Sequence, residues 1–231
     1  MCNERVARAE GDAAATYAGR VPRPPRPRIP GGVYHVITRG NRRQRIFDAP
    51  GDAPSFTGLL ARVVRTLEWR CHDFCLMPNH VHLVLETPNA DLPAGMHRLN
   101  GVYAKWFNHH HGVEGHLFER RYRSIVIETD GHLLSLARYL ALNPVAAGLC
   151  EDPAEWPWSS YRAMIGLEPA PEFLTCDWLL SMFGSDRDRA RVAFKAFVAG
   201  EVPEADPGAW HQGAEGSRGE TRIEGPRQPK P

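Results

Sequence analysis

The sequence lacks the features of a membrane protein and of a disulfide-stabilised secreted protein. No apolar run approaches the roughly 18 residues that can cross a bilayer, and the start lacks the charged, apolar and small-residue order of a signal peptide. The five cysteines are odd in number and include no Cys-X-X-Cys pair, which argues against a disulfide framework and against structural zinc. We therefore expect a cytoplasmic protein with reduced, mostly buried thiols and no membrane partner.

The chain also has little net charge, but its charges are unevenly distributed. The formal net charge is +1, whereas residues 20–145 hold 17 Lys/Arg against 10 Asp/Glu and residues 146–231 hold 9 against 14. A basic half suits a polyanionic substrate, because neutralising phosphates supplies most of the sequence-independent affinity for nucleic acids. An ordinary solvated surface is the alternative explanation of such an excess.

A His-X-His pair is the most prominent motif. Residues 74–85 predict two short strands separated by Pro78-Asn79, because proline lacks the N–H that a ladder needs. His80 and His82 open the second strand and project from one face, which we expect to be exposed to a site, while Val81 points to the other. Two imidazoles placed in this way can share one divalent ion and leave positions open for catalysis. A pair that merely caps an exposed strand is the alternative.

A second segment, residues 135–144, predicts a helix that Pro144 ends. Tyr139 and Asn143 are four residues apart and so lie on one helix face. Asp130 is the predicted N-cap. Tyr139 falls outside the apolar stripe of the helix, which predicts a solvent-accessible side chain. The stripe comprises Leu133, Leu136, Ala137 and Leu140.

Together these motifs resemble the REP-associated tyrosine transposases, which belong to the HUH (His-hydrophobic-His) single-strand endonucleases. The resemblance runs from about residue 28 to residue 166. Its motifs are Tyr34-His35-Val36, Arg39-Gly40-Asn41, Met77-Pro78-Asn79-His80, Arg138-Tyr139, Leu142-Asn143-Pro144 and Trp156-Pro157-Trp158-Ser159-Ser160-Tyr161. It implies an α+β fold of the HUH endonuclease type, with a ferredoxin-like antiparallel sheet, helices on one face and a small helical C-terminal extension.

The same resemblance implies a chemistry. His80 and His82 would hold Mg²⁺ or Mn²⁺, Tyr139 would attack DNA, and Asn143 would complete the metal shell or orient the phosphate. The substrate would be single-stranded DNA with a hairpin (a REP-like palindrome), cleaved and rejoined through a 5′-phosphotyrosine by a nucleoid-associated monomer or homodimer. A domesticated hairpin-binding protein without strand transfer and a metal-dependent hydrolase that uses water are the alternatives. Tyr103 is the rival nucleophile, but its apolar stripe indicates a core or base-stacking role.

Two basic segments are candidates for DNA binding. The first is a loop with Arg39, Asn41, Arg42, Arg43 and Arg45, whose guanidinium groups could hold phosphates or read base edges. The second contains Arg120, Arg121, Tyr122 and Arg123, where cations and rings alternate as on single-strand-binding surfaces. A solvated turn and a solvated face are the respective alternatives.

The chain divides into four predicted parts. Residues 1–28 form a flexible, basic and proline-rich leader, residues 29–166 form the HUH tyrosine transposase domain, residues 167–200 form a helical accessory segment, and residues 201–231 form a disordered tail. Within the domain we expect a strand at 32–38, helices at 54–70 and 94–110, and a loop feeding a strand within 115–128. The Trp-Pro-Trp segment should anchor the chain that follows the catalytic helix onto the core.

Overall fold

A computed structural model describes residues 28–119 and 121–200 of the chain. The expected leader at residues 1–27, Arg120 and the expected tail at residues 201–231 lie outside the described residues. The element order within the described part follows the predicted one closely.

The centre of the fold is a four-stranded antiparallel sheet with the order β2-β3-β1-β4. Its strands are β1 (Gly32–Arg39), β2 (Arg70–Met77), β3 (His80–Thr87) and β4 (Arg123–Val126). The predicted break at Pro78-Asn79 is the turn between β2 and β3. The register places His82 opposite Ile37 of β1 and Cys75 of β2, so His82 occupies the middle of the sheet.

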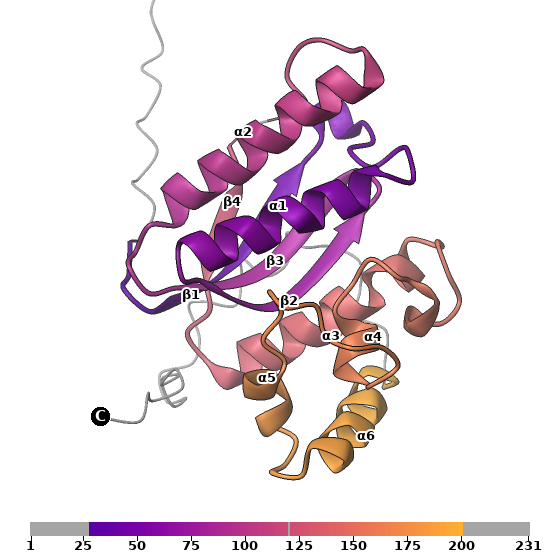
Figure 1. The fold of residues 1–231 in the computed structure, drawn as a ribbon. Coiled ribbons are helices and arrows are strands. Elements are labelled where there is room, and N and C mark those ends of the chain that lie inside the picture. Colours follow the sequence, from indigo (N-terminus) through magenta and orange to yellow (C-terminus); the bar gives the residue numbers. More distant parts are fainter. Residues whose placement is uncertain (1–27, 120, 201–231) are drawn as a thin grey trace, which may run out of the picture.

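Two long helices, α1 (Asp52–Thr66) and α2 (Leu92–His111), lie side by side over one face of the sheet (Figure 1). The Asn100 side chain of α2 donates a hydrogen bond to the Thr38 hydroxyl at 3.1 Å, which fixes α2 on this face. Tyr103 of α2 is fully buried and its hydroxyl donates to the Ile46 carbonyl at 2.6 Å. The interpretation of Tyr103 as a core residue is therefore confirmed.

The helix that carries Tyr139, α3 (Asp130–Ala146), packs against the opposite face of the sheet. The expected placement of helices on one face is therefore wrong. Its N-cap is Thr129 and not the predicted Asp130, because the Thr129 side chain accepts a hydrogen bond from the His132 N–H. Pro144 does not end the helix as predicted; it lies in the last turn. Pro144 has no N–H to donate to the Leu140 carbonyl and its ring crowds that carbonyl, but the helix continues to Ala146.

The remaining chain forms a helical extension along the β2 edge. Its elements are η2 (Pro153–Glu155), α4 (Tyr161–Met164), α5 (Asp177–Ser181) and α6 (Arg187–Val198). The Trp158 carbonyl accepts from the Leu76 N–H at 2.8 Å, and the Ser160 N–H donates to the Phe74 carbonyl at 3.0 Å. The Trp156 indole N–H donates to the Leu76 carbonyl at 3.0 Å, which confirms the predicted anchoring role.

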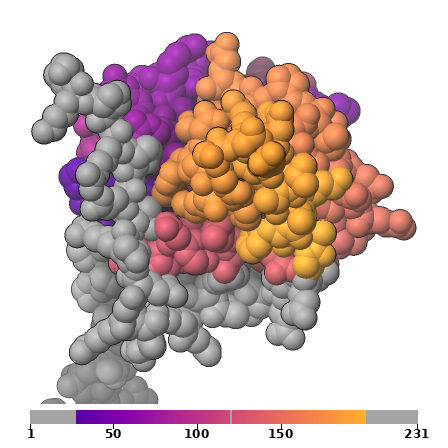
Figure 2. All heavy atoms as spheres, turned by 90° about the horizontal axis from the view of Figure 1, so that it is seen from below, coloured from indigo at the N-terminus to yellow at the C-terminus, as the bar shows by residue number. Residues whose placement is uncertain are grey.

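The extension thus pairs with a strand edge that would otherwise present unpaired backbone groups to solvent. In Figure 2 its orange and yellow atoms form one continuous surface against the sheet domain. Arg138 of α3 lies 5.6 Å from the ring centroid of Phe197 in α6, so α3 is held between the sheet and α6. This position explains why α3 is buried on more than one side.

The thiols follow the expectation from the sequence. Cys71, Cys75 and Cys176 are buried and Cys150 is half-buried, and none of these four forms a disulfide. Burial raises the pKa of the Cys176 thiol to about 11, so it stays protonated at neutral pH. In the part of the chain that the structure describes, no helix combines the length and apolarity needed to span a membrane.

Candidate active site

The two histidines of the His-X-His motif lie together at the start of β3. Their ring centroids are 4.9 Å apart. The Nδ1 atom of His80 lies 2.6 Å from the Asn79 side-chain oxygen, which can only accept, so Nδ1 carries the proton and Nε2 carries a lone pair. The Nδ1 atom of His82 lies 2.9 Å from Nε2 of His35. Both rings are therefore oriented through Nδ1.

Burial keeps both imidazoles neutral at physiological pH. Loss of solvent and the neighbouring Arg39 lower the pKa of His80 to about 4. Loss of solvent, with the nearby His35, His80 and Arg39, holds the pKa of His82 well below its usual range. A neutral imidazole is the form that binds a metal ion.

The two histidines are also suited to bind a divalent ion. The His82 Nε2 atom is buried and has no hydrogen-bond partner among the described residues, which is costly unless something binds there. Ligating histidines usually donate their other ring N–H to a protein group, as His80 does. Among the described residues no group of three or more His, Cys, Asp or Glu side chains is placed to hold one ion, so further ligands must be amide, water or phosphate oxygens.

Tyr139 lies beside His82. The two ring centroids are 5.6 Å apart and the rings are nearly perpendicular, at 87°. The tyrosine is only 5% exposed, so the prediction of a solvent-accessible side chain is wrong. The apolar stripe indicated one buried side of the helix, whereas α3 is covered by the sheet and also contacts α6.

The prediction that His82 stands on an exposed strand face is wrong for the same reason. His82 is fully buried, whereas His80 at the end of the strand is half-buried. Asn143 lies one turn after Tyr139 on α3 and is half-buried. Its helical spacing from Tyr139 is as predicted, and its role toward a metal or a phosphate stays a prediction.

The first basic segment borders the histidines. Arg39 ends β1 opposite His80, and Arg42, Arg43 and Arg45 are exposed on and just after the short η1 turn (Asn41–Arg43). The loop is fixed to the β2–β3 turn because the Asn79 side-chain amide donates to the Arg43 carbonyl at 3.1 Å. Asn41 is half-buried within it.

The second basic segment runs beside the first. The Asn41 N–H donates to the Leu117 carbonyl at 2.7 Å and the Glu119 N–H donates to the Arg39 carbonyl at 3.1 Å. Arg121 and Arg123 are exposed. Arg120 lies outside the described residues.

Tyr122 is only 6% exposed and belongs to the hydrophobic core. The predicted role of Tyr122 as a base-stacking residue is therefore wrong. Its neighbours on both sides face solvent, and a residue between two exposed ones on an extended segment points inward.

His35 and Asn79 stand in two of the motifs that carried the resemblance, but neither was predicted to be a site residue. Each contacts the Nδ1 atom of one site histidine. His35 belongs to β1, and its contact with His82 follows from the β1–β3 register, which the sequence alone does not reveal.

Comparison with known proteins shows which family this fold and site resemble. The family described as "Transposase IS200 like" matches residues 30–143, a range that includes both histidines, Tyr139 and Asn143. Over these residues the chain resembles the IS200-like transposases.

Two relatives narrow the resemblance to the REP-associated tyrosine transposases, as the motifs predicted. A "Putative REP-associated tyrosine transposase" of Haemophilus influenzae is 28% identical over 115 residues, which cover 45% of this chain and 63% of the relative. The chain thus matches less than two thirds of that relative's length. A solved structure of a REP-associated tyrosine transposase bound to a REP hairpin matches with a TM-score of 0.53 and 19% identity, over 65% of this chain and 89% of that one. This structural likeness confirms the predicted α+β fold class.

Proposed function

We propose that this protein is a metal-dependent transesterase that cleaves and rejoins single-stranded DNA beside hairpins, with Tyr139 as the nucleophile. The observation that carries the proposal is the contact between the Tyr139 ring and His82, whose buried Nε2 atom has no hydrogen-bond partner within residues 28–119 and 121–200. A phenol and two neutral imidazoles meet there, beside two basic segments suited to a phosphate backbone.

The residues of the chain have separate roles in this proposal. His80 and His82 would hold Mg²⁺ or Mn²⁺, and Asn143 would supply an amide oxygen to the metal or the phosphate. A bound divalent ion withdraws charge from a phosphate oxygen and stabilises the leaving oxygen. Arg39 at the end of β1 and the exposed arginines of the η1 turn would hold the strand in place.

Tyr139 would perform the covalent step. Its Oη atom forms a bond to phosphorus, the bond from phosphorus to the 3′ oxygen breaks, and the phenolic proton finally resides on the released 3′ hydroxyl. A phenol has a pKa of about 10, so its deprotonation needs assistance at the site. The resulting 5′-phosphotyrosine keeps the energy of the ester, which allows the reverse reaction to rejoin strands.

The substrate in this proposal is a stem-loop with an unpaired flank. The structural relative described above was determined bound to a REP hairpin. The exposed arginines of this chain suit a flexible strand whose phosphates can follow their positions. A cytoplasmic, nucleoid-associated monomer or homodimer stays the prediction for its cellular state.

The burial of Tyr139 favours a second candidate, a hairpin-binding protein that does not cut. One experiment separates the two. Stem-loop DNA is labelled at its 3′ end, in the fragment whose 5′-phosphate would become bonded to Tyr139. It is incubated with protein and Mg²⁺ or Mn²⁺, and a covalent adduct is sought on a denaturing gel.

The transesterase should give an adduct that Tyr139→Phe abolishes while hairpin binding changes by no more than a few fold. Tyr103→Phe is the matched control, since it removes a hydroxyl from a buried tyrosine outside the site and should retain the adduct. Binding without any adduct from the unaltered chain would support the second candidate instead.

A further inference from the structure

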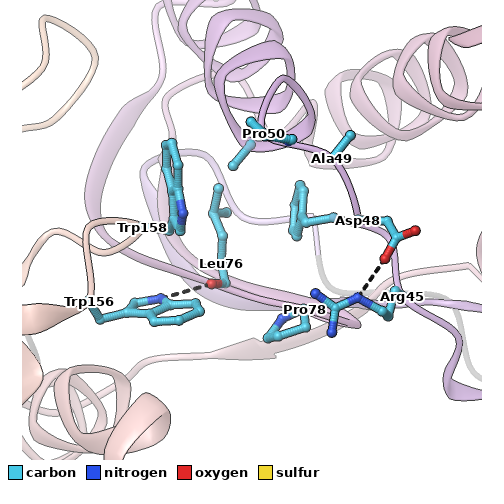
Figure 3. Close-up of a pocket in the computed structure, with 10 residues that line it drawn as sticks. Arg45, Asp48, Ala49, Pro50, Leu76, Pro78, Trp156 and Trp158 are labelled. Carbon is cyan, nitrogen blue, oxygen red and sulfur yellow. Dashed lines mark hydrogen bonds and ion pairs between the residues drawn. The ribbon is translucent and has the colours of Figure 1, made fainter. Parts of the chain in front are cut away.

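A pocket of about 230 Å³ opens between the β2–β3 turn, the start of α1 and the Trp-Pro-Trp segment. Figure 3 shows the Trp156 and Trp158 rings on one side, the Arg45–Asp48 pair on the other, and Leu76 between them. Drug-sized ligands usually occupy pockets of about 300 to 1,000 Å³, so this one suits a single flat ring system.

The walls of the pocket are held by contacts within the protein. Trp156 is anchored through its indole N–H to the Leu76 carbonyl, and Trp158 through its backbone to the Leu76 N–H. Opposite them, the Arg45 Nε atom lies 2.8 Å from the Asp48 carboxylate, and both side chains are largely exposed, at 60% and 59%. A guanidinium has five N–H donors, so an Arg45 side chain paired to Asp48 through Nε has further donors to offer a ligand at the rim.

The pocket adjoins the candidate active site along the chain and through hydrogen bonds. Pro78 lines the pocket and lies two residues before His80. The Ile46 N–H, next to Arg45, donates to the Pro78 carbonyl at 2.8 Å. Leu76 lies on the face of the sheet under α1 and α2, whereas His80 and His82 lie on the opposite face. A strand bound at the histidines would therefore reach the pocket by passing around the β2–β3 turn, beside Arg42 and Arg43.

We propose that this pocket binds one unpaired nucleobase of the DNA strand that enters the active site. The inference rests on the proposed function and adds a base-recognition subsite to it. Indole rings stack on the face of any base, whereas a guanidinium and a carboxylate at the rim can donate to and accept from a base edge. The pocket thus combines affinity from Trp156 and Trp158 with discrimination from Arg45 and Asp48.

The test uses the full-length chain with Tyr139→Phe, so that DNA stays intact, and a stem-loop selected for binding from a pool with randomised unpaired flanks. Each flank nucleotide is replaced in turn by an abasic site, and affinity is measured by fluorescence anisotropy. One position should weaken binding about tenfold to a hundredfold, the usual value of stacking one base on aromatic rings.

Trp158→Leu should cause a similar loss with intact DNA and no further loss with that abasic DNA, because two changes that remove the same contact are not additive. Trp178→Leu is the matched control. Trp178 is a half-buried indole on α5 that packs on His72, with a ring-centroid distance of 4.4 Å, and does not line the pocket. Its substitution should leave the abasic effect unchanged.

A second measurement needs no substitution in the pocket. 5-Iododeoxyuridine at the sensitive flank position should cross-link on irradiation to Trp156, Trp158 or Phe47, as mapped by mass spectrometry. Additive losses, or a cross-link only to residues outside the pocket, would overturn the subsite while leaving hairpin binding and the proposed function intact. Failure of the chain to bind any stem-loop would overturn both.

Discussion

The two faces of the sheet are buried to a similar degree but are built from different residues. The face under α1 and α2 carries Tyr34, Val36, Val81, Leu83 and Leu85, all essentially inaccessible. The opposite face, which packs on α3, has buried apolar residues such as Ile37, Cys75 and Val84, but it also buries four polar ones: His35, His82, Asp73 and Glu86. The first face stabilises the fold through apolar burial.

Burying polar groups on the second face costs free energy unless each group has a hydrogen-bond partner. His35 and His82 meet each other, and the Ser160 hydroxyl donates to Asp73. His72 and Arg70 bind Glu86 at 2.9 and 2.6 Å. Among the described residues, two buried ring nitrogens have no hydrogen-bond partner, Nδ1 of His72 and Nε2 of His82, and the second belongs to the ring beside Tyr139. Burial on this face therefore keeps the His82 imidazole neutral.

The largest expected effect follows from His82→Ala. Metal-dependent cleavage should be lost, because one imidazole with oxygen ligands would hold Mg²⁺ or Mn²⁺ poorly. Since His82 is buried and contacts His35, the free energy of unfolding should also fall, by about 1 to 3 kcal/mol. Adduct formation and urea unfolding measure the two effects, and full activity of the variant in excess chelator would refute the metal assignment.

Leu83→Ala alters the apolar face alone. We expect the free energy of unfolding to fall by about 2 to 5 kcal/mol, because the side chain is fully buried and its loss leaves a cavity. The rate of adduct formation per folded molecule should stay unchanged. A selective loss of activity in a stable variant would show that the two faces are not separate in function.

The free energy of unfolding should depend on pH because a histidine of the second face is held neutral in the fold. The folded-state pKa of His80 is about 4, below its unfolded value near 6.5. The neutral imidazole therefore makes its full contribution to stability only above about pH 6.5. This contribution should be lost as the pH falls from about 6.5 to 4. In the His80→Gln variant the free energy of unfolding should therefore fall less steeply over this range, by up to about 1.4 kcal/mol less per pH unit.

Asp73 has the opposite effect on the pH dependence of stability, but it is present in wild type and in His80→Gln, so its effect cancels when the two are compared. Burial raises the pKa of Asp73 to about 7, which by itself favours the folded state as the pH falls. Urea unfolding between pH 7 and pH 5 is the measurement. Parallel stability curves for the two proteins would contradict the neutral-imidazole account.

The smallest expected effect concerns the exposed basic loop. Arg43→Gln should weaken hairpin binding a few fold without affecting the fold, because Arg43 is exposed. The slope of log affinity against log salt should become shallower by about one. Arg65→Gln, an exposed arginine on α1, is the control and should leave the slope unchanged.

The sequence predicted the local structure well, because local patterns determine it. Residue alternation identified β1, the β2–β3 pair and the shared face of His80 and His82, and helical spacing identified α1, α2, α3 and α6. The burial of Tyr139 and Tyr122 was missed, because periodicity shows which residues share a face but not which distant element covers it. The Trp156–Trp158 pocket was missed for a related reason, since its other wall comes from Arg45 and Asp48, far away in the chain.

The most direct test of the central claim is the identity of the residue that becomes bonded to DNA. The chain is incubated with stem-loop DNA and Mn²⁺, digested with nuclease and trypsin, and its peptides are analysed by mass spectrometry. The account predicts a nucleotide bonded through its 5′-phosphate to Tyr139. A nucleotide on Tyr103 or another residue, or cleaved DNA without any protein-bound nucleotide, would contradict it.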